Sequence, residues 1–116
     1  MLWALGQAKR LRASTRAALD SPANDVVVSS ASVWEASVKI SSGKLRVPMD
    51  LADALRRSGY LELDITYEHA VHAGSLPRHH GDPFDRMLVA QAQLEGLTLV
   101  TTDRALAVYD VALLPA

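Results

Sequence analysis

At 116 residues, the chain is long enough for one domain with a hydrophobic core and too short for two. A hydrophobic fraction of 49% and a charged fraction of 22% are ordinary for a globular protein, which excludes a disordered chain, and no apolar run is long enough to cross a membrane. The net charge of −1 gives no overall attraction to nucleic acid, and the lack of cysteine excludes disulfides and thiolate-bound metal. We therefore expect a single cytoplasmic domain over residues 1–116 with no membrane association.

The first half of the chain predicts three helices and one buried strand. A helix is expected over residues 11–19, a continuous apolar strand over 25–29, and further helices over 32–41 and 51–57. The strand is of the kind that is buried on both faces of a parallel sheet. Gly43 and Gly59 follow the predicted helices over residues 32–41 and 51–57 and should end them. Asp50 is the expected N-terminal cap of the helix over 51–57.

The second half continues the alternation of strands and helices. In chain order we expect a strand over residues 61–65, helices over 67–73 and 83–95, a strand over 97–101, a short helix over 104–109 and a last strand over 111–114. The best-defined helix has Pro83 at its first position and Gly96 after its end. The alternating order predicts an α/β fold with a mainly parallel sheet flanked by helices.

Three acidic residues fall where such a fold binds its ligands. Glu35, Asp85 and Asp103 each come just after a predicted strand or in the first turn of the next helix. Ligands of parallel sheets bind beyond the carboxyl ends of the strands. We therefore expect the three carboxylates at one edge of the fold.

Each acid also has a purely structural interpretation. Glu35 could close a capping box with Ser32 and pair with Lys39 one turn later. Asp82 and Asp103 could cap the helices that follow them.

Asp85 fits the structural interpretation poorly. Its helix is apolar on nearly all sides and should be buried, and Asp82 already provides the cap. A buried carboxylate is costly unless it is paired or bound to metal.

Oxygen ligands without cysteine favour Mg²⁺ or Mn²⁺ over Zn²⁺. A metal held by Glu35, Asp85 and Asp103 would activate water and stabilise charge on a phosphodiester, and Thr101 and Thr102 could orient that water. His69 and His72 share a helix face, but a structural zinc site needs four ligands, so we expect no zinc there.

Four segments of the chain resemble PIN-domain ribonucleases, and most closely the VapC toxins of bacterial toxin–antitoxin pairs. These segments are residues 32–39, 43–45, 82–92 and 99–103, in that order. The resemblance covers almost the whole chain. It implies a PIN-like three-layer fold and a Mg²⁺- or Mn²⁺-dependent endoribonuclease that cleaves RNA. It also implies a cognate VapB-like antitoxin that holds the enzyme inactive, and a homodimer.

The resemblance also assigns site residues. Glu35, Asp85 and Asp103 match the second, third and fourth acids of the family, with Asp82 and Thr101 in supporting positions. The first family acid, at the end of an opening apolar strand, has no counterpart, because no acid precedes Asp20.

The sequence beginning Met-Leu-Trp-Ala-Leu resembles the first family helix. We therefore expect the first strand to be missing and the domain to be truncated at its N-terminus. A catalytically impaired protein that binds and titrates an antitoxin is the alternative to an active ribonuclease.

Overall fold

The computed structural model describes residues 2–3, 17, 20–21, 23–44, 50–79, 81–101 and 103–115. Within them, a parallel sheet has the strand order β3-β2-β1-β4-β5. Its strands are β1 (Leu2–Trp3), β2 (Val27–Ser29), β3 (Leu61–Leu63), β4 (Leu99–Thr101) and β5 (Leu113–Pro115). All pairings between neighbouring strands are parallel. The predicted α/β fold with a parallel sheet is confirmed.

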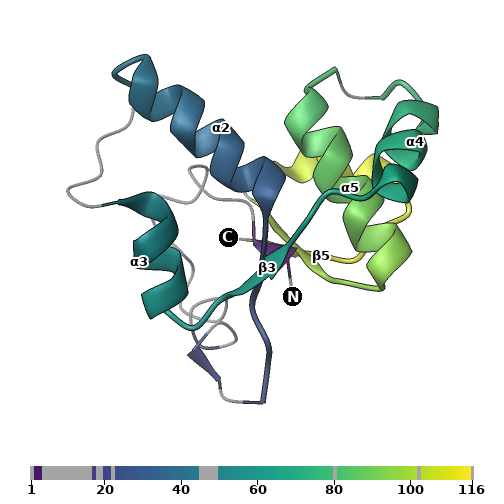
Figure 1. Ribbon diagram of the computed structural model, residues 1–116. Coiled ribbons are helices and arrows are strands. Elements are labelled where there is room, and N and C mark those ends of the chain that lie inside the picture. Colours follow the sequence, from purple (N-terminus) through teal and green to yellow (C-terminus); the bar gives the residue numbers. More distant parts are fainter. Residues whose placement is uncertain are drawn as a thin grey trace.

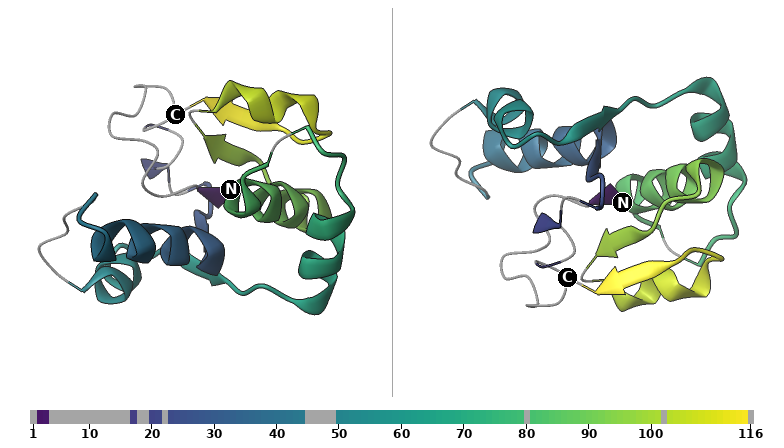
Figure 2. Two further views of the ribbon diagram at one scale, coloured as in Figure 1. Left: turned by 90° about the horizontal axis from the view of Figure 1, so that it is seen from above. Right: turned by 90° about the horizontal axis from the view of Figure 1, so that it is seen from below.

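The helices lie on different sides of this sheet. They are α2 (Ser30–Ser41), α3 (Leu51–Arg57), α4 (Tyr67–Ser75), α5 (Pro83–Glu95) and the short 3₁₀ helix η1 (Arg104–Val108). In Figure 1, α2 and α3 lie on one side of the molecule and α4 and α5 on the other. Figure 2 shows η1 and β5 at the end of the molecule opposite α2 and α3, with α5 between them. None of the described helices is long and apolar enough to cross a membrane.

Several predicted boundaries agree closely with the structure. The helices over residues 83–95 and 51–57 have the predicted bounds, and Gly43, Gly59 and Gly96 all adopt positive φ. The strands are shorter than predicted, and residues 104–108 form a 3₁₀ helix. The predicted helix over residues 11–19 lies outside the described residues, apart from Ala17.

The beginning of the chain differs from the expectation. Leu2 and Trp3 were expected inside a helix, with the first strand missing; instead they form β1 in the centre of the sheet. Leu2 is in register with Val27 on one side and with Leu99 on the other. The parallel neighbours on both sides offer backbone hydrogen bonds to a strand, and this outweighs the helical pattern of the sequence. β1 is only two residues long, and the residue after it is an alanine.

The core forms where α5 packs against the sheet. Leu88, Val89, Ala90 and Leu99 are fully buried there, and Leu106 of η1 joins them. The prediction that the helix over residues 83–95 is a buried helix is therefore confirmed. Its burial makes every polar group on that helix costly unless it has a partner.

Candidate active site

Glu35 lies on α2 with its carboxylate turned into the protein. Only 7% of the residue is exposed, and its Oε1 atom is buried without a hydrogen-bond partner among the described residues. Its Oε2 atom lies 3.9 Å from Lys39 Nζ, the predicted pair one turn along the helix. A buried carboxylate oxygen without a partner is energetically costly, so a ligand or a proton at this atom would stabilise the protein.

The predicted capping box between Ser32 and Glu35 was wrong. α2 begins at Ser30, and Ser29 is its cap, with the Ser29 hydroxyl accepting a hydrogen bond from the Ala31 amide at 3.0 Å. Glu35 consequently lies beyond the first turn of α2 and cannot reach back to cap it. Helix capping therefore does not explain why a glutamate stands at position 35.

The first turn of α5 carries two acids with different roles. Asp82 caps the helix, because its Oδ1 atom accepts hydrogen bonds from the amides of Phe84 at 2.8 Å and Asp85 at 3.3 Å. Asp85 is only 3% exposed. Both predictions, that Asp82 is the cap and that Asp85 is buried, are confirmed.

Glu35 and Asp85 come together where α2 meets α5. Burial raises the pKa of the Glu35 carboxyl above its usual value; Lys39 opposes this increase, and the charges of Asp82 and Asp85 add to it. The neighbouring side chains on the two helices also meet, since the rings of Trp34 and Phe84 make an edge-to-face contact with centroids 4.9 Å apart. Carboxylates held together in a buried place repel one another unless a proton or a cation lies between them.

Asp103 follows β4 and has a structural role of its own. Its side chain accepts a hydrogen bond from the Ala105 amide at 2.9 Å, so it caps η1 as predicted. Its own amide donates to the hydroxyl of buried Thr101 at 3.1 Å. β1 separates β4 from β2, which leads into α2. Thr102 lies outside the described residues.

Within the described ranges, no three acids or histidines lie close enough together to hold a metal ion. The structure thus brings Glu35 close to Asp85 and Asp82, and does not bring Asp103 into the same group. The three-acid site over Glu35, Asp85 and Asp103 stays a prediction.

Two polar residues of α5, Arg86 and Gln91, were not singled out from the sequence. Arg86 donates hydrogen bonds to the carbonyls of Ala73, Leu76 and Pro77, and so holds the loop before α5. Gln91 and His69 are fully buried and bonded to one another. The only signal in the sequence for Arg86 and Gln91 is that each is a polar residue inside an otherwise apolar helix.

A family model matches most of the chain. The model of the PIN domain matches residues 1–112 of the chain. The chain belongs to the PIN-domain family.

Two solved structures have a similar fold. The chain is similar to a structure of VapBC2 from Rickettsia felis bound to a DNA fragment from their promoter, with a TM-score of 0.61 and 15% identity. That alignment covers 89% of this chain and 81% of the other. It is also similar to a structure of FitAB bound to an IR36 DNA fragment, with a TM-score of 0.64 and 17% identity over 99% of this chain and 94% of the other. No curated protein matches the chain significantly.

Replacing Glu35 with Gln is expected to stabilise the metal-free protein at neutral pH. Because its pKa is raised in the folded state, folding favours protonated Glu35, and the free energy of unfolding falls as the pH rises above the unfolded value of about 4.5. The variant removes this loss, so it should be more stable than the wild type at pH 7. The difference should disappear well below the unfolded pKa.

Urea unfolding at several pH values in the presence of EDTA measures this difference. Glu62→Gln is the matched control, since Glu62 is an exposed glutamate paired with Arg56 at 3.0 Å. Equal or lower stability of Glu35→Gln at pH 7 would show that the buried carboxylate is not strained.

Proposed function

We propose that this PIN-domain protein is a Mg²⁺- or Mn²⁺-dependent endoribonuclease, the toxin of a toxin–antitoxin pair. The observation that carries the proposal is the meeting of Glu35 and Asp85 in a buried place, with one Glu35 oxygen left without a partner. Membership of the PIN-domain family supports a nuclease, and the similarity in fold to the VapBC2 structure supports a toxin.

The chemistry of the donor set fits a hard divalent cation. Glu35 and Asp85 would hold it directly, while Asp82 adds negative charge nearby. Such a cation lowers the pKa of a bound water and offsets charge on a phosphodiester. Asp103 is the proposed third carboxylate, and its amide contact with Thr101 fixes the turn that carries it.

RNA cleavage by the purified chain tests this proposal. With Mn²⁺ or Mg²⁺ in excess, we expect single-stranded RNA to be cut at internal positions, and we expect EDTA to abolish the cleavage. Activity that persists in EDTA would contradict a metal-dependent mechanism. Absence of cleavage with every divalent ion tested would contradict the ribonuclease.

A groove lined by residues of α2, α3 and β3 supports an antitoxin as partner. It encloses about 290 Å³ between α2, α3 and β3. Its lining includes Trp34, which is 62% exposed, and Leu61, which is 52% exposed. We propose that an antitoxin segment places apolar side chains in this groove. The protein is also proposed to act as a homodimer.

Leu61→Asp is expected to weaken antitoxin binding about tenfold or more, because a charge would replace an apolar contact. Co-purification with the product of a small neighbouring gene measures the effect. Val71→Asp is the control, an exposed apolar residue on α4, away from the groove. Equal loss of binding in both variants, or in neither, would contradict this location.

A second function is favoured by one observation. The described acids form no complete three-ligand group. A protein that binds and titrates an antitoxin without cutting RNA would need only the groove. Antitoxin binding by the wild-type chain without any RNA cleavage would favour this alternative.

A further inference from the structure

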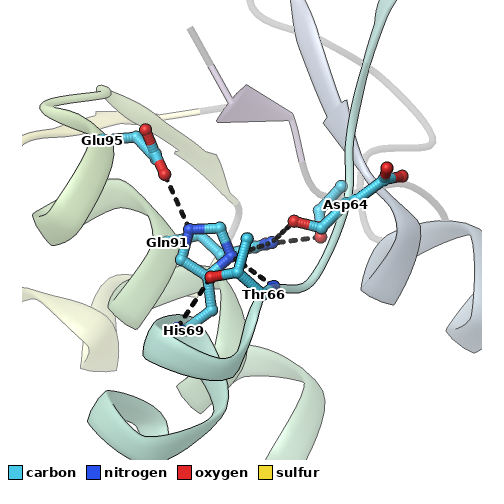
Figure 3. A network of polar contacts seen from close by, with 6 residues as sticks. Asp64, Thr66, His69, Gln91 and Glu95 are labelled. Atoms are coloured by element: carbon cyan, nitrogen blue, oxygen red, sulfur yellow. Dashed lines mark hydrogen bonds and ion pairs between the residues drawn. The ribbon is translucent and has the colours of Figure 1, made fainter.

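A buried chain of hydrogen bonds joins the start of α2 to α4 and α5. The Ser29 hydroxyl, at the start of α2, donates a short hydrogen bond to Oε1 of Gln91 on α5. Nε2 of Gln91 then contacts Nδ1 of His69 at 3.3 Å and the Asp64 carbonyl at 3.4 Å. His69 Nε2 lies 2.8 Å from Glu95. Figure 3 shows the contacts of His69 and Gln91 in this chain.

One backbone amide fixes the direction of these bonds. The Thr66 amide donates to His69 Nδ1 at 3.1 Å, so this nitrogen is an acceptor and Gln91 must turn its NH₂ group toward it. The Oε1 atom of Gln91 is then turned toward Ser29. Ser29, His69 and Gln91 are at most 1% exposed, so water cannot replace a lost partner without cost.

The bond between Ser29 and Gln91 sets how α2 lies against α5. Ser29 comes six residues before Glu35, and Gln91 comes six residues after Asp85. At a rise of about 1.5 Å per residue, each acid is about 9 Å along its helix from this bond. The contact between Trp34 and Phe84, the neighbours of the acids, is the second link between the helices. The two helices therefore run antiparallel and are joined at two points. Glu35 and Asp85 lie beside the second point, the contact between Trp34 and Phe84.

From this arrangement we infer that Gln91 is a positioning residue for the metal site. Through Ser29 it fixes α2 relative to α5, and so fixes the separation of the Glu35 and Asp85 carboxylates. The inference rests on the proposed function, because it assumes that these carboxylates bind a divalent cation. Small displacements of ligands have large effects on a site that must match the geometry of an ion.

The same helix provides a matched control. Gln93 is also on α5; its Oε1 atom lies 2.6 Å from His72 Nε2, and its Nε2 atom donates to the Asp110 carbonyl at 2.9 Å. These contacts join α5 to α4 and to the segment before β5, and none of them involves α2. Loss of the Gln93 contacts should lower stability without changing the separation of the acids.

The test is a calorimetric titration of the RNA-free protein with Mn²⁺, for the wild type, Gln91→Met and Gln93→Met. We expect Gln91→Met to weaken Mn²⁺ binding about tenfold or more, while Gln93→Met stays within about twofold of the wild type. Equal affinities of Gln91→Met and the wild type would overturn the positioning role. Equal weakening by both variants would also overturn it, since a general loss of stability would then suffice.

A second variant covers the case in which Gln91→Met does not fold. Ser29→Ala removes the same bond from the other side, and it should weaken Mn²⁺ binding in the same direction. Where both fold, the double variant should be no weaker than the worse single variant, because the two changes remove one shared bond. Strict additivity would contradict the shared bond.

Failure of the proposed function gives a different result. If the wild type binds no Mn²⁺, or if Asp85→Asn binds it as well as the wild type, the metal site itself is wrong. If the wild type binds Mn²⁺ through Asp85 and Gln91→Met is unaffected, only the positioning role is wrong.

Discussion

Asp85→Asn is expected to reduce metal-dependent RNA cleavage by about 100-fold or more, without unfolding the protein. Asparagine has nearly the same shape as aspartate but no charge, so it is a much poorer ligand for a hard cation. Asp82, not Asp85, caps α5, so the variant keeps the helix cap and should stay folded. Initial cleavage rates at saturating Mn²⁺, together with a melting curve, measure both effects.

Asp53→Asn is the matched control for this substitution. Asp53 stands in the first turn of α3, as Asp85 stands in the first turn of α5, but it is exposed and pairs with Arg57 at 3.1 Å. Its replacement should leave cleavage unchanged. If Asp85→Asn kept most of the wild-type rate, the carboxylate pair would not be the centre of the activity.

Arg86→Met is expected to lower the free energy of unfolding by about 3 kcal/mol. The Arg86 guanidinium donates to the carbonyls of Ala73 and Leu76 at 2.9 and 3.0 Å, and to the carbonyl of Pro77 at 3.0 Å. Methionine keeps much of the apolar stem but leaves these carbonyls without their donor. Because they form the end of α4 and the loop before Asp82, cleavage should also fall.

Urea unfolding followed by circular dichroism measures this loss. Arg57→Met provides the comparison, because Arg57 is an exposed arginine whose ion pair with Asp53 is of the kind that contributes little. A loss for Arg86→Met no larger than that for Arg57→Met would show that its three carbonyl contacts do not hold the loop.

The parts of the fold that depend on local sequence signals were predictable. α5 has the predicted bounds because Pro83 and Gly96 act within one turn of its ends. The burial of Asp85 followed from the apolar residues around it in the sequence. Predicting the bounds of α5 and the burial of Asp85 requires no knowledge of residues far away in the sequence.

The parts that depend on distant contacts were not predictable. Ser29, Ser30 and Ser32 are all plausible caps, and the choice among them depends on where β2 leaves the sheet. The wrong choice of Ser32 gave Glu35 a capping role that it does not have. Likewise, the sequence of residues 1–5 is compatible with a helix, and only pairing with β2 and β4 makes residues 2 and 3 a strand.

The burial of His69 also depends on distant contacts. It completes a capping box with Thr66, a role that glutamate or glutamine usually takes. Its other nitrogen meets Glu95, which is 26 residues further along the chain. The sequence placed His69 on a helix face with His72, but gave no sign that the two have separate partners on α5.

Glu35 and Asp85 are proposed to share a divalent cation. A crystal of the protein grown or soaked with Mn²⁺, with data collected at the manganese absorption edge, tests it most directly. We expect an anomalous peak between α2 and α5, within coordination distance of Glu35 Oε1 and of the Asp85 carboxylate, and no such peak in an Asp85→Asn crystal. A fully occupied Mn²⁺ elsewhere in the molecule, with none at Glu35 and Asp85, would contradict the claim.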